Sequence, residues 1–194
     1  MTHAERWGLG LGAAALGLAA LFRRLRVVNA RGVVEADPQG LADAAGVPLD
    51  VYALASMMQS EEHDDRGRLA VGRAAWNAVR GDRSKLVRKL IPHGRFAAQD
   101  SGQYAATSTA PTARTLALAA AVTEGRVPDF VDHAVQWDAP AVQDRNHECY
   151  LREPQRFPQY RFSSADIAER RTRGGAREVR VPGVPETRFW SYAA

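Results

Sequence analysis

A pair of helical patterns joined by a short polar turn constrains this chain most strongly. Residues 49–62 carry apolar side chains at helical spacing and end in the adjacent acids Glu61 and Glu62. Residues 67–80 are rich in alanine and are followed by Gly81, a residue type that commonly ends helices. The second helical pattern follows the acids almost at once, so both acids lie at the junction between the two helices.

Most of the remaining chain after residue 37 is also helical in pattern. Further helices are predicted at residues 37–46, 84–91, 111–124 and 163–173, the last opening with a capping box. Residues 130–162 show no clear period, so we expect loops there. Residues 177–181 alternate and residues 187–192 are aromatic, which favours short strands. The sequence therefore predicts a mainly α domain with a small β element.

The two acids are the leading candidates for chemistry. A carboxylic acid at the end of a half-buried helix is partly desolvated, which raises the pKa of such a group and lets it hold a proton near neutral pH. A helical wheel places both Glu61 and Glu62 near the buried side, so geometry does not choose between them. The competing interpretation is two solvated acids at a frayed helix end.

Composition limits the partners and cofactors. The 194 residues suit one domain plus an appendage, and the net charge of +4 suits an anionic partner. The arginines are scattered and not interleaved with aromatic residues, so we expect no nucleic-acid partner. Cys149 is the single cysteine, which excludes an intrachain disulfide, and His147, Glu148 and Cys149 lack a second ligand pair for zinc. We therefore expect neither a metal nor another cofactor.

The N-terminal part is a separate element. Residues 7–22 are uncharged, rich in Gly, Ala and Leu, and flanked by arginines. Sixteen residues are fewer than the ~20 usual for a spanning helix. Three interpretations stay open: a short membrane anchor, an anchor that can leave the bilayer, or a helix buried in an assembly. We assign residues 1–30 to this apolar helix with its basic flank, and residues 37–194 to the domain.

Several short motifs resemble one known family. Leu54, Ala55 and Glu61 match a helix that ends in an acid, and the following helix matches through Ala70, Val71, Asn77 and Val79. Residues 103–107 with 111–112, and residues 125–129 with 134–138, match two later segments. Together these motifs resemble the cell wall hydrolase family that includes the spore cortex-lytic enzymes, across residues 37–138.

The resemblance implies a lysozyme-like fold that cleaves the glycan strands of peptidoglycan, as a glycosidase-type lytic transglycosylase. It selects Glu61 as the single catalytic acid. It also implies that Tyr104 and Thr107 border the sugar groove and that Gln136 and Trp137 contact the sugar. A buried anchor for Tyr104 and a core position for Trp137 are the alternatives that the residues leave open.

Location and activity have alternatives as well. The arginines after residue 22 oppose export of the domain under the positive-inside rule, and a phage-encoded protein delivered by a particle would escape that conflict. We therefore expect the bacterial cell envelope or a phage virion. The alternative function is a non-catalytic structural component of a virion or envelope complex that keeps the fold, with a membrane or assembly partner at the N-terminal helix.

Overall fold

The computed structural model describes residues 26–28, 34–91 and 110–192, and the description of side chains begins at residue 37. The helices are α2 (Pro38–Ala45), α3 (Leu49–Glu61), α4 (Asp65–Ala78), α5 (Arg83–Leu90), α6 (Ala113–Thr123), α7 (Pro140–Arg152) and α8 (Ser164–Arg173), with a 3-10 turn at Pro158–Tyr160. The strands are β1 (Arg26–Val28), β2 (Val34–Ala36), β3 (Gln136–Asp138), β4 (Ala176–Val179) and β5 (Arg188–Tyr192). The prediction of a mainly α fold with a small β element is confirmed.

Local capping explains where the predicted helices begin and end. The Asp37 side chain accepts hydrogen bonds from the backbone N–H groups of Gln39 and Gly40, and α2 ends at Gly46, which has a left-handed φ of 68°. The predicted capping box is present at α8, where Ser163 and Asp166 each accept a hydrogen bond from the other's backbone N–H. These helices form where the sequence predicts them because the capping groups lie within a few residues of each end.

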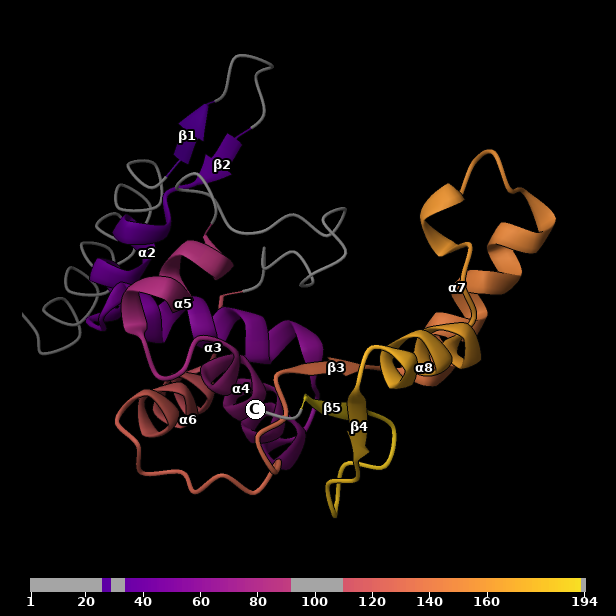
Figure 1. The fold of residues 1–194 in the computed structure, drawn as a ribbon. Helices are drawn as coiled ribbons and strands as arrows, with labels where there is room; N and C mark the ends of the chain where they lie inside the picture. The colour runs from indigo at the N-terminus through magenta and orange to yellow at the C-terminus, as the bar shows by residue number, and fades with distance from the viewer. Residues whose placement is uncertain (1–25, 29–33, 92–109, 193–194) are drawn as a thin grey trace, which may run out of the picture.

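Helix α3 is the centre of the core. It is buried continuously from Asp50 to Met58 and packs against α2, α4, α5 and α6 (Figure 1). Gly72 lets α4 approach closely, because a Cβ atom at that position would lie 2.7 Å from Sδ of the fully buried Met58. A helix enclosed in this way holds its last turn, and the acids there, in a defined place.

The larger sheet docks beside these helices. Its strand order is β3-β5-β4, antiparallel throughout, with Trp137 opposite Phe189 and Gln136 opposite Trp190. Phe189 is fully buried in the core shared with α3 and α4. Successive residues of a strand face opposite sides, so Trp137 lies on the core side of β3 and Gln136 on the other side.

The expectation of loops over residues 130–162 is wrong in part. Helix α7 occupies Pro140–Arg152 and, with the 3-10 turn and α8, forms an arm that projects from the rest of the fold (Figure 1). None of the residues in α7 is buried, so it lacks the apolar stripe from which a helical period is recognised. Ala139-Pro140, with proline in the first turn, was the available signal.

The predicted N-terminal apolar helix lies outside the described residues. Within the described ranges, every helix is too short or too polar to cross a membrane.

Candidate functional site

Glu61 is the last residue of α3, and its side chain is half-buried. The indole Nε1–H of Trp137 donates a hydrogen bond of 3.2 Å to its carboxylate oxygen Oε2. Trp137 also packs against the edge of the hydrophobic core and is itself half-buried. The contact links the end of the central helix to strand β3, two segments 76 residues apart in sequence.

Glu62 faces a different set of neighbours. It follows α3 in extended conformation, and the Thr187 hydroxyl donates a hydrogen bond of 2.5 Å to its Oε1. Its other carboxylate oxygen lies against Gly67, where a Cβ atom would come within 2.7 Å. The Arg68 guanidinium donates to its backbone carbonyl at 3.0 Å. Glu62 therefore joins the start of α4 to the segment that leads into β5.

The surroundings of Glu62 alter its affinity for a proton. Burial raises the pKa of the Glu62 carboxyl above its ordinary value, and the hydrogen bond from Thr187 opposes that rise. The nearby negative charges of Asp64 and Glu61 raise this pKa further, while His63 lowers it. Glu62 is therefore a partly desolvated acid directly after the end of α3.

A polar network fixes the turn before the acids. Oε1 of Gln59 accepts a hydrogen bond of 2.6 Å from the Thr115 hydroxyl and a longer one of 3.4 Å from the Thr112 hydroxyl. Thr112 is also the N-cap of α6, since its hydroxyl accepts from the Thr115 backbone N–H. The sequence predicted a helix at residues 111–124 but not this contact with α3. Because the last turn of α3 is held by α6, β3 and the chain before β5, the two carboxylates are preorganised.

Asp129 anchors the segment that leads to β3. Its carboxylate accepts hydrogen bonds from Asn77 Nδ2 at 3.2 and 3.3 Å and contacts His133 Nδ1 at 2.9 Å. The same amide of Asn77 donates to the Ala134 carbonyl at 3.2 Å. Asn77, one of the residues that carry the family resemblance, therefore positions this segment against α4.

Asp138 also holds neighbouring elements together. It forms ion pairs with Arg171 at 2.5 Å and Arg188 at 2.8 Å, and it accepts a hydrogen bond of 3.0 Å from the Trp190 indole. These contacts tie α8 to the sheet. Asp129 and Asp138 thus both hold elements together through several partners.

The structure brings together two of the five predicted site residues. Glu61 and Trp137 are in contact, whereas Gln136 points to the opposite side of β3, is exposed, and accepts a hydrogen bond from the Tyr192 hydroxyl at 3.1 Å. Tyr104 and Thr107 lie outside the described residues. The residues that sequence reasoning missed are Thr115 and Thr187, whose partners are distant in sequence.

The site has no obvious metal-binding set. Among residues 37–91 and 110–192, no group of three or more His, Cys, Asp or Glu side chains is arranged to hold a metal ion. Comparisons with protein-family models, curated proteins and solved structures found no match to the chain.

Proposed function

We propose that this chain cleaves the glycan strands of peptidoglycan, with a lysozyme-like fold and Glu61 as the general acid. The observation that carries the proposal is the half-buried Glu61 carboxylate at the end of the buried helix α3, hydrogen-bonded to Trp137 across the helix–sheet junction. A fixed acid beside an aromatic ring suits a sugar substrate, because the ring can pack against the apolar face of a pyranose.

The proposed reaction is that of a lytic transglycosylase. The Glu61 carboxylic acid donates its proton to the glycosidic oxygen as the bond from the anomeric carbon breaks. The resulting carboxylate then takes the proton of the sugar's own 6-hydroxyl, whose oxygen attacks the anomeric carbon and closes an anhydro ring. One acid suffices for both steps, which fits the engagement of Asp129 and Asp138 in ion pairs. The chemistry needs no metal or other cofactor.

Glu62 is the rival acid within the same mechanism, because its pKa is raised by burial. We assign the role to Glu61 because the family resemblance selects it and because Glu62 is held by Thr187 and fills the space at Gly67. The assignment also places the acid against Trp137.

A matched pair of substitutions tests the assignment. Glu61→Gln should abolish cleavage of purified peptidoglycan, since the amide has the same shape but no proton to donate, while Glu62→Gln should keep most of the activity. Mass spectrometry of the products measures anhydro-muramyl ends, and circular dichroism checks that both variants fold. An inactive Glu62→Gln beside an active Glu61→Gln would reverse the assignment. Reducing ends in place of anhydro ends would indicate hydrolysis by water.

A non-catalytic component of a virion or envelope complex is the second candidate. The projecting arm favours it, because Val142 and Leu151 on α7 are 49% and 64% exposed and offer contact area to a partner. Under either function, we propose the bacterial envelope or a phage particle as the location. Glycan products from the wild-type chain would exclude the non-catalytic alternative.

A further inference from the structure

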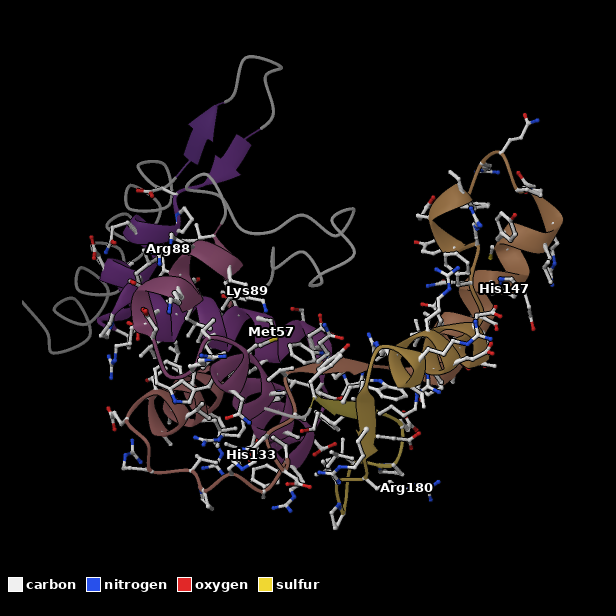
Figure 2. The ribbon with its side chains drawn as sticks, in the orientation of Figure 1. Met57, Arg88, Lys89, His133, His147 and Arg180 are labelled. Carbon is white, nitrogen blue, oxygen red and sulfur yellow. The ribbon has the colours of Figure 1, made fainter. Side chains whose placement is uncertain are left out.

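A groove of about 780 Å³ lies between α4, α5 and the β3-β5 edge of the sheet, and Trp137 is not among its lining residues. Its wall includes Trp76 and Arg80 from α4, Lys89 from α5, His133 from the preceding loop, and Gln136 and Tyr192 from the sheet. Lys89 and His133 are both labelled in Figure 2. Several elements distant in sequence therefore converge on one cavity.

Two cationic side chains of the groove, Arg80 and Lys89, carry charge that no acidic side chain pairs among the described residues, whereas Arg73 and His133 both contact Asp129. Among the described residues, neither Arg80 nor Lys89 has an ion-pair partner, and Lys89 is half-buried. Arg73, also in the wall, is compensated, because its Nε lies 3.8 Å from the Asp129 carboxylate and its Nη1 donates to the Val127 carbonyl at 3.4 Å. Burial lowers the pKa of Lys89, which shows that its ammonium group is partly desolvated. An anionic group would compensate this charge in a site where water screens it only partly.

The groove also carries aromatic and amide groups suited to a sugar or a peptide. Trp76 is half-buried in its wall, and the Tyr192 ring is 38% exposed beside Gln136. Gln136 and Trp137 are consecutive, so their Cα atoms lie about 3.8 Å apart. A polymer held at Glu61 and Trp137 would thus pass close to Gln136 in the wall of the groove.

We infer that this groove binds a carboxylate-bearing muramyl peptide, with Arg80 and Lys89 pairing its carboxylates and Trp76 and Tyr192 packing against its apolar parts. The inference rests on the proposed function for the identity of the ligand. Peptidoglycan fits the mixed lining because its peptide carboxylates lie next to sugar rings. Carboxylates and guanidinium or ammonium groups form charge-assisted hydrogen bonds, the stronger class in proteins.

The test is titration calorimetry on the full chain with a soluble disaccharide-peptide that has free carboxylates, and with the same compound after conversion of its carboxyls to amides. The free acid should bind about tenfold more tightly than the amide, the loss expected for one charge-assisted hydrogen bond. Arg80→Gln and Lys89→Gln should each reduce that preference, and the double variant should abolish it.

Arg88→Gln is the matched control, because it removes one positive charge next to Lys89 (Figure 2) from a residue that does not line the groove. Equal binding of acid and amide, or an equal effect of Arg88→Gln, would overturn the inference, as would failure of both compounds to bind. A parallel cleavage assay on peptidoglycan separates the two claims. Carboxylate-dependent binding without cleavage would support the groove and refute the enzyme; cleavage without carboxylate preference would refute the groove alone.

Discussion

The hydrogen bond between Trp137 and Glu61 can be measured by a double-mutant cycle. Trp137→Phe removes the indole N–H that donates to Glu61 at 3.2 Å but keeps an aromatic ring against the core. Glu61→Gln removes the charge and keeps the shape. The cycle compares the wild type, both single variants and the double variant, so that the packing lost by the smaller ring cancels.

The expected coupling follows from the geometry. A hydrogen bond to a charged group contributes about 1.5–3 kcal/mol to the free energy of unfolding when it is well shielded. Both side chains here are half-buried, so water screens the contact and we expect about 1 kcal/mol. For a chain of this size, 1 kcal/mol corresponds to a shift in melting temperature of about 2–4 °C.

Urea unfolding of the four proteins at neutral pH measures the coupling. Trp137→Phe combined with Glu62→Gln is the control pair, because the Glu62 carboxylate is hydrogen-bonded to Thr187. The effects of these two substitutions on the free energy of unfolding should therefore add within about 0.5 kcal/mol. If the effects of Trp137→Phe and Glu61→Gln on the free energy of unfolding also add to this precision, the contact on which the proposed site depends is refuted. Trp137→Ala adds a further distinction: a large loss of stability with unchanged glycan binding per folded molecule would assign the ring to the core alone.

Two more outcomes follow from the same region. The pKa of Glu62 is raised in the folded state, so the protonated carboxyl adds to the free energy of unfolding. This contribution is present below the ordinary pKa of 4.5 and is lost as the pH rises through the raised pKa of the folded state. Urea unfolding across pH 4 to 8 should therefore show the wild type losing stability relative to Glu62→Gln as the pH rises. A difference in the free energy of unfolding that stays constant with pH would contradict this. Gly72→Ala should destabilise the chain by about 1–2 kcal/mol, since overpacking against Met58 outweighs the gain in helix propensity. A more stable Gly72→Ala protein would show that α4 lies further from α3.

The sequence by itself determined the elements whose signals are local. Asp37 and Gly46 bound α2, and the capping box of Ser163 and Asp166 opens α8, because each cap acts over a few residues. The apolar run into Glu61 identified the buried helix and the acids at its end. The exposed helix α7 was missed because it has no buried face, and residues 136–138 were not recognised as a strand because three residues carry too short a pattern.

Only the tertiary structure decided what each acid faces. Glu61 and Glu62 are adjacent in sequence and equivalent on a helical wheel, yet one meets Trp137 and the other Thr187. The helix ends between them, and the extended backbone of Glu62 turns its side chain toward α4 and the chain before β5. Gln136 and Trp137 were likewise both assigned to sugar contacts, but successive residues of β3 face opposite sides of the sheet, which separates them. The register of β3 depends on pairing with β5, some 50 residues later in the sequence. Such contacts depend on how distant segments pack, and no local pattern specifies them.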